Sequence, residues 1–404
     1  MSTMRSSLPV LRRLSSSLPR RKQYHPSGLL QVRSFSSNDS GFEMDQVCEL
    51  AASNLRFGPG ATAEVGQDLA EHFRCKRIAI FTDPNIAGLD CMRVLLQSLE
   101  ENKLDYFVYD QVRIEPNDRS FQHAIEFLSN QEYEAVVALG GGSVIDTAKA
   151  ANLYACHPPK ESFYDYVNPP LGRGKPIPGP VKPLIAIPTT AGTGSETTGV
   201  CIFDDTATKS KTGIANRHLK PALGIVDPNN TVTLPGPVAK YSGLDVLCHA
   251  IESYTALPFS KRHKPTSPVL RPAYQGSNPI SDVWSLFALR TTAEFLTAAV
   301  NLDDPQHDEA RAKMLLASSA AGMGFGNAGG KVVSFLCWLA GCCVMERGNS
   351  RIGRHLDMLL LLLPMLLLLL PKMSGSIYML LFLFIFLNTS FVLIWTLTSS
   401  FSSC

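Results

Sequence analysis

Charged residues are sparse in this sequence and do not cluster by sign beyond its N-terminus. Only 18% of the 404 residues are charged, and the formal net charge is +2. No basic patch dominates, which argues against a nucleic-acid-binding surface. The ten cysteines form no CxxC pair and no zinc-finger spacing. They indicate a reducing compartment in which most cysteines serve as small buried apolar side chains.

Acidic residues are absent from the first 38 positions, and the first one is Asp39. The same stretch is rich in serine and leucine. Its basic residues are Arg5, Arg12, Arg13, Arg20, Arg21, Lys22 and Arg33. This composition, without the long apolar core of a secretory signal, predicts that residues 1–38 are a mitochondrial transit peptide and that the protein lies in the matrix. A disordered basic arm is the alternative.

The length leaves room for two or three domains, and from about Phe42 the composition is that of a globular domain. Apolar runs typical of buried strands alternate with helical stretches. Strands are expected at residues 77–83, 106–110, 135–139, 184–187 and 222–227, and helices at 91–102, 120–129 and 244–256. This alternation predicts a doubly wound α/β sheet with its ligand at the carboxyl ends of the strands.

The strand expected at residues 135–139 runs into three glycines. Gly140, Gly141 and Gly142 are followed by Ser143, Asp146 and a helix-forming run. Glycines let backbone N–H groups approach an anion, and the helix that starts there directs its partial positive end to the same place. The pattern indicates a phosphate cradle. A glycine-rich turn that binds nothing is the alternative.

A second loop follows the strand expected at residues 184–187. It offers three hydroxyls and two glycines, from Thr189, Thr190, Thr193, Gly192 and Gly194. Hydroxyls and close backbone approach suit ribose and phosphate oxygens. A turn that only caps the next helix through Ser195 and Glu196 is the alternative. Two such loops at strand ends of one sheet favour a ligand.

The helix expected at residues 244–256 carries Asp245 and His249 four positions apart. Both side chains leave one face of the helix and can share a divalent cation, with iron or zinc as the metals that suit this donor pair. A surface hydrogen bond between the two side chains is the alternative.

Three motifs together resemble the iron-containing (group III) alcohol dehydrogenases. They are the GGGS turn with its aspartate at 140–146, TTAGTGSE at 189–196 and GLDVLCHAIESY at 243–254, and the resemblance covers residues 42–329. It implies a dehydroquinate synthase-like fold. An α/β dinucleotide-binding domain is expected over residues 42–233, and an all-α domain, truncated here, over residues 234–330.

The resemblance also implies site residues. The expected NAD contacts are Asp83 at the adenosine ribose, Gly141, Gly142 and Ser143 at the pyrophosphate, Asp146 of the same motif, Thr189, Thr190 and Thr193 along the cofactor, and Lys211 at a ribose. Asp245 and His249 are expected to be two of four ligands to a divalent metal, iron or zinc.

Within the family, the sequence is most similar to members that exchange hydride between small hydroxyacids and oxoacids. The implied reaction oxidises 4-hydroxybutyrate to succinate semialdehyde and reduces 2-oxoglutarate to 2-hydroxyglutarate, with NAD kept bound. One alternative is a metal alcohol dehydrogenase that releases NAD in each cycle. Another is a catalytically silent, membrane-attached protein that kept the cofactor fold. A homo-oligomer is compatible with the sequence but not indicated by it.

After Gly329 the sequence departs from the family. The next histidine is His355, so both downstream histidine ligands of the family are missing, and we expect a weak metal site and poor catalysis. Residues 331–404 form a hydrophobic tail, in which 377–397 is a candidate membrane span. An alternatively spliced or misassigned end is favoured over a membrane anchor.

Overall fold

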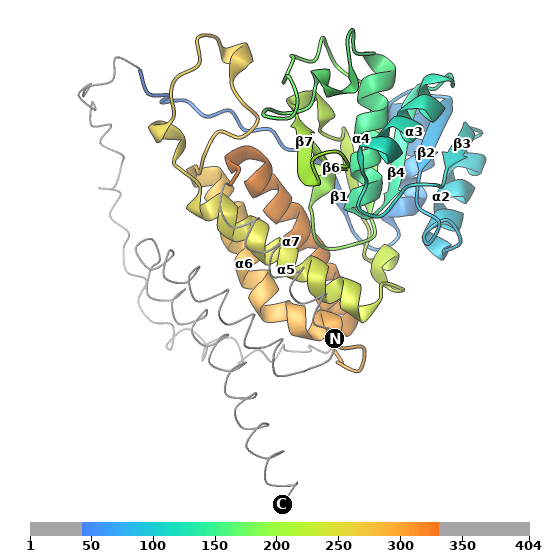
Figure 1. The fold of residues 1–404 in the computed structure, drawn as a ribbon. Coiled ribbons are helices and arrows are strands. Elements are labelled where there is room, and N and C mark those ends of the chain that lie inside the picture. Colours follow the sequence, from blue (N-terminus) through green and yellow to red (C-terminus); the bar gives the residue numbers. More distant parts are fainter. Residues whose placement is uncertain (1–42, 331–404) are drawn as a thin grey trace, which may run out of the picture. The chain divides into compact units, whose positions relative to one another are not determined.

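The computed structural model describes residues 43–330 (Figure 1). The predicted transit peptide and the tail, with its candidate span at residues 377–397, lie outside the described residues. Between residues 43 and 330, no helix is both long enough and apolar enough to cross a bilayer.

Six parallel strands form the main sheet, in the order β1-β8-β5-β4-β2-β3. Their bounds are β1 Asn54–Phe57, β2 Arg77–Phe81, β3 Asp105–Tyr109, β4 Ala135–Gly140, β5 Leu184–Pro188 and β8 Leu223–Val226. Every residue of β4 and β5 is buried, as expected of central parallel strands covered on both faces. The predicted parallel α/β sheet is confirmed.

Helices cover both faces of this sheet because alternate strand residues point to opposite sides. On one face, Ile78 and Ile80 of β2 pack with Leu95 and Leu99. On the other face, Ala79 and Phe81 of β2 pack with residues of two further helices. The covering helices are α2 (Asp90–Glu101), which carries both leucines, α3 (Asp118–Ser129) and α4 (Gly142–Cys156). A short helix, α1 (Val65–Gln67), follows β1.

Several elements had no expected bounds of their own, although the two helices among them lie in the expected all-α region of residues 234–330. They are β1, an antiparallel hairpin of β6 (Val200–Asp205) and β7 (Ser210–Ala215), and the helices α6 (Pro279–Val300) and α7 (His307–Ala328). The expected helix at 244–256 begins earlier and is α5 (Gly236–Thr255).

Helices α5, α6 and α7 pack side by side and form the helical part of the molecule (Figure 1). Their shared core includes Val246, Leu289 and Leu315, and it extends to Ala191 and Val226 of the sheet part. Among the described residues, those from 44 to 330 fall in one compact unit. The predicted boundary between two domains at residues 233 and 234 stays a prediction.

Residues 45–51, here called the N-terminal strap, run along the helical part and bind it through side chains. Arg271 Nε donates to Asp45 Oδ2 (3.1 Å), Glu49 N donates to Gln275 Oε1 (2.7 Å), and Ala51 N donates to Asn327 Oδ1 (2.9 Å). The Ala51 carbonyl also accepts from Lys220, which precedes β8. The strap therefore joins residues of both parts.

Candidate functional site

Three neighbouring strands, β2, β4 and β5, end at one rim of the sheet. Thr82 Oγ1 donates to Leu139 O (2.9 Å), and Thr189 N donates to Gly140 O (3.1 Å), so the segments after these strands are bonded to one another. Asp83, the GGGS turn and the loop after β5 therefore lie together, as the parallel sheet requires.

The GGGS turn and the second loop, residues 189–198, are in direct contact. A Cβ added to Gly142 would lie 2.6 Å from Thr193 Cγ2 and 2.7 Å from Thr193 Oγ1. One added to Gly141 would lie 3.3 Å from Thr190 Oγ1. Only glycine allows this approach. Helix α4 begins at the turn, and no side chain caps its first N–H groups, which leaves them for another acceptor.

The three predicted threonines differ in exposure. Thr193 is exposed and Thr190 is partly buried, whereas Thr189 is only 2% exposed. The Thr193 hydroxyl accepts from Ser195 N (3.2 Å). The hydroxyls of Thr190 and Thr193 are thus the ones that a ligand can reach.

Asp83 and Lys211 lie at two other places near this rim. Asp83 Oδ1 accepts from Asn85 N (2.8 Å), which fixes the carboxylate within a turn after β2. Lys211 is exposed on β7, opposite Asp204 of β6. The roles of both residues toward a cofactor stay predictions.

A chain of contacts links the hairpin to the GGGS turn. Asp204 N donates to Pro116 O (2.9 Å), and the neighbouring Glu115 N donates to Ser143 Oγ (3.1 Å). The hairpin that carries Lys211 is therefore only a few residues removed from the start of α4. The Ser143 hydroxyl accepts in this link and keeps its own O–H as a donor. Its predicted pyrophosphate contact stays a prediction.

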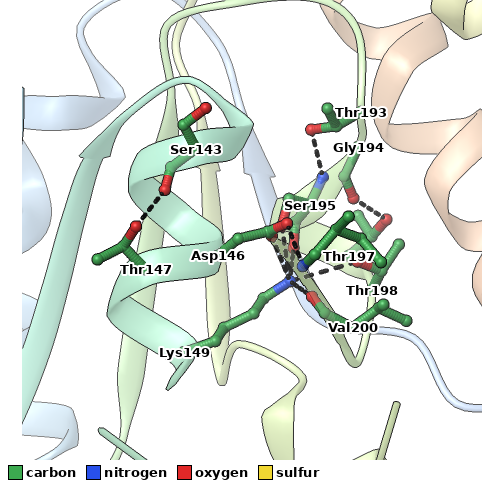
Figure 2. A network of polar contacts seen from close by, with 11 residues as sticks. Ser143, Asp146, Thr147, Lys149, Thr193, Gly194, Ser195, Thr197, Thr198 and Val200 are labelled. Atoms are coloured by element: carbon green, nitrogen blue, oxygen red, sulfur yellow. Dashed lines mark hydrogen bonds and ion pairs between the residues drawn. The ribbon is translucent and has the colours of Figure 1, made fainter. Parts of the chain in front are cut away.

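Asp146 points into the protein and not toward the rim (Figure 2). Its Oδ1 accepts from Ser195 Oγ (2.5 Å) and its Oδ2 from Ile202 N (2.9 Å). Burial raises the pKa of the Asp146 carboxyl, and the nearby ammonium of Lys149 opposes that shift. The carboxylate thus joins α4 to the second loop and to β6. Its predicted contact with a cofactor stays untested.

Lys149 is a functional candidate that the sequence did not single out. Its side chain is fully buried beside Asp146. Its Nζ donates to Ser195 O (2.7 Å), Ser195 Oγ (2.7 Å), Val200 O (2.9 Å) and Thr198 Oγ1 (3.3 Å) (Figure 2). Burial lowers the pKa of the Lys149 amine, and Asp146 opposes that shift. The available signal was a lysine within a run of small apolar helix residues.

The second loop also contacts α7 of the helical part. Gly194 has a φ of 60°, and a Cβ there would lie 2.6 Å from Ser318 O and 2.7 Å from Gly322 Cα. Ser319 Oγ donates to Glu196 Oε1 (2.6 Å), and burial raises the pKa of the Glu196 carboxyl. The loop is therefore held between α4 and α7.

Asp245 and His249 lie together on α5, with His249 Nε2 3.7 Å from Asp245 Oδ1. His249 stacks on Phe325 of α7, with ring centroids 4.8 Å apart, and its buried Nδ1 has no partner among the described residues. Carboxylate and imidazole groups in this arrangement fit one divalent cation as two ligands. Within residues 43–330, no group of three or more such ligands is found.

The sequence was compared with those of known protein families. The sequence profile described as "Iron-containing alcohol dehydrogenase" matches residues 52–228. This part of the chain belongs to the iron-containing alcohol dehydrogenase family. The resemblance to this family is thereby confirmed, and two of the three motifs, at residues 140–146 and 189–196, lie within the match.

Relatives and solved structures of this family extend the match. The mitochondrial hydroxyacid-oxoacid transhydrogenases of Rattus norvegicus and Homo sapiens are 55% and 52% identical over 291 residues, which cover 72% of this chain. The chain spans 62% of the length of these relatives.

Among solved structures, a 1,3-propanediol oxidoreductase has a TM-score of 0.61 at 26% identity and covers 73% of this chain and 70% of its own. A Bifidobacterium kashiwanohense sulfoacetaldehyde reductase in complex with NAD+ has a TM-score of 0.59 at 28% identity, and covers 74% of this chain and 72% of its own. These matches confirm the predicted fold.

Proposed function

We propose that this protein is an NAD-dependent oxidoreductase that exchanges hydride between a hydroxyacid and an oxoacid. The observation that carries the proposal is the contact of Gly142 with Thr193, which closes two small-residue loops around the uncapped start of α4. The relatives named hydroxyacid-oxoacid transhydrogenase supply the reaction. Its substrates would be 4-hydroxybutyrate and 2-oxoglutarate.

The residues at the rim fit a dinucleotide. The N–H groups at the start of α4, at Gly142 and Ser143, would bind the pyrophosphate, because an uncapped helix start favours an anion. Asp83 would accept from ribose hydroxyls, and Thr190 and Thr193 would line the cofactor, with Thr189 behind them. Lys211 would reach a ribose from β7. NAD, when bound, supplies the hydride acceptor and donor.

Asp245 and His249 would hold a divalent cation, iron or zinc, which supplies Lewis-acid polarisation of the substrate hydroxyl when bound. We propose that this site is weaker than a four-ligand one, because the sequence has no histidine between Gly329 and His355. The protein would then bind nucleotide well and turn over slowly.

Titration of the purified full chain with NADH, followed by fluorescence, tests the cofactor assignment. Saturable binding is expected. A folded protein without nucleotide affinity would overturn the proposal.

Turnover assays separate the alternatives. A transhydrogenase needs both 4-hydroxybutyrate and 2-oxoglutarate but no added NAD. An ordinary dehydrogenase needs added NAD and one alcohol. A silent binding protein shows neither. Turnover with Fe²⁺ or Zn²⁺ equal to that of the rat relative would show that further ligands come from elsewhere in the chain.

We also propose a mitochondrial location, because the composition of residues 1–38 and the names of the relatives agree. Microscopy of the full chain with a C-terminal tag tests it, and a cytosolic signal would contradict it.

A further inference from the structure

We propose that Lys149 is a positioning residue that fixes where the second loop lies against α4. It thereby sets the distance between that loop and the GGGS turn, which together form the nucleotide cradle. This inference rests on the proposed function, because it concerns the same site. Lys149 itself does not touch the cofactor in this account.

The bonds of Lys149 are concentrated on one segment. Four oxygens lie within hydrogen-bond distance of its three N–H donors, and all four belong to residues 195–200, shortly after the exposed Thr193. Taking an ammonium group out of water is costly and is offset only by close polar partners. The bonds to this segment therefore hold it at one distance from α4.

Three successive contacts, here called the ladder, join α4 to residues 193–200. Gly142 meets Thr193, Asp146 accepts from Ser195, and Lys149 donates to Ser195 and Val200. Positions 142, 146 and 149 share one helix face because they recur at helical spacing. If the contacts of Asp146 and Lys149 shift, Thr193 must therefore shift relative to the start of α4.

The Ser195 hydroxyl is the central member of this ladder. It accepts from Lys149 Nζ (2.7 Å) and donates to Asp146 Oδ1 (2.5 Å). A neutral side chain at position 149 would leave buried oxygens without a donor and Asp146 without its nearest cation. A buried polar group without a partner is costly, so these oxygens would move to where water can reach them. That movement would carry the second loop with it.

The test compares NADH affinity of the full chain with three variants: Lys149→Met, which removes the donor, Lys149→Arg, which keeps a cation, and Leu128→Ala. The last is a control for lost stability alone, because Leu128 is a fully buried residue of the core around α3. Thermal melts define the temperature at which each variant is folded, and affinities are measured below it.

The expected result for Lys149→Met is a Kd raised by about tenfold or more, equivalent to roughly 1.4 kcal/mol. Lys149→Arg should bind more tightly than Lys149→Met. Leu128→Ala should melt earlier but keep the wild-type Kd within about twofold, since Leu128 packs between α3 and α4 and takes part in none of the hydrogen bonds that join α4 to the second loop.

Coupling to Thr193 provides a second readout. If Lys149 acts through the placement of this hydroxyl, Lys149→Met should cost less affinity in a Thr193→Val background than in the wild type. A wild-type Kd in folded Lys149→Met, equal Kd values for the Arg and Met variants, or full additivity with Thr193→Val would overturn the inference. A wild type that binds no NADH would instead overturn the proposed function.

Discussion

The rim of the sheet and the Asp245–His249 pair are built in different ways. The rim combines the ends of three parallel strands, and its loops are held by α4 on one side and α7 on the other. The pair consists of two side chains on a single helix. The rim is made largely of backbone, so it forms wherever the sheet forms. A metal site needs ligands from several segments, so it is complete only when every segment is present.

The largest effect is expected for Gly194→Ala, which would separate the rim from α7. The alanine would have to adopt a φ of 60° and would place its Cβ 2.6 Å from Ser318 O. Backbone strain and overpacking together should lower the free energy of unfolding by roughly 2–5 kcal/mol. Urea unfolding measures it. Gly88→Ala is the matched control, since an added Cβ there meets nothing within 4 Å. Equal stability of the two variants would contradict a tight contact with α7.

The next largest effect is expected for Gly142→Ala, which changes the contact between the two loops but not the contact with α7. Gly142→Ala places a Cβ 2.6 Å from Thr193 Cγ2, so one loop has to move away from the other. We expect the Kd for NADH to rise by about tenfold or more. Gly179→Ala is the control, because its nearest neighbour would lie at an ordinary 3.8 Å. If both variants bind NADH alike, the two loops do not form one site.

A smaller effect is expected in the N-terminal strap. The hydrogen bond from Arg271 lowers the pKa of Asp45, so the folded state favours the ionised carboxylate. This stabilisation is present above the unfolded pKa, about 4, and is lost as the pH falls through the folded value. Asp45→Asn should therefore cost about 1–2 kcal/mol at pH 7, and less at pH 3.

Asp90→Asn is the matched control for the strap, since Asp90 pairs with Arg93 on the surface at 2.7 Å and both side chains are well exposed. Such a pair contributes little to stability. Urea unfolding of both variants at the two pH values measures the difference. A cost at Asp45 that did not change with pH would show that its charge is not what stabilises the strap.

The smallest effect on nucleotide affinity is expected at the metal pair. Asp245→Asn removes a candidate ligand from α5 but breaks none of the hydrogen bonds that hold the two loops of the rim, so the Kd for NADH should change by less than about twofold. Zinc retention after dialysis should fall. Glu294→Gln on α6 serves as the control for a lost carboxylate. A tenfold loss of NADH affinity would show that the rim and the pair are one site.

Much of the sheet part was predictable because its strands are buried apolar runs separated by turns. Strands β2, β4 and β5 start at the expected residues, and their ends differ from the expected ones by one or two residues. The hairpin of β6 and β7 was not expected, since its strands mix buried and exposed positions without a strict alternation. The bounds of helix α7 could not be predicted, although an all-α region was expected there, because small residues are buried all round the helix and leave no amphipathic period.

The two glycine loops could be found from the sequence, since runs of glycine and threonine directly follow two of the expected strands. The inward orientation of Asp146 and the burial of Lys149 could not. Lysine is ordinarily exposed, and the acceptors of Lys149 begin 46 residues further along the chain. Only the fold brings such a charge and its partners together.

The strap limits where the predicted transit peptide of residues 1–38 could be cut off. A leader removed anywhere upstream of Asp45 leaves the bonds to Arg271, Gln275 and Asn327 in place. A protease that trims past Ala51 strips all three and also frees the Lys220 ammonium from its carbonyl acceptor. If the predicted leader is removed, the new amino terminus must therefore lie before this segment for the strap to keep its bonds to both parts.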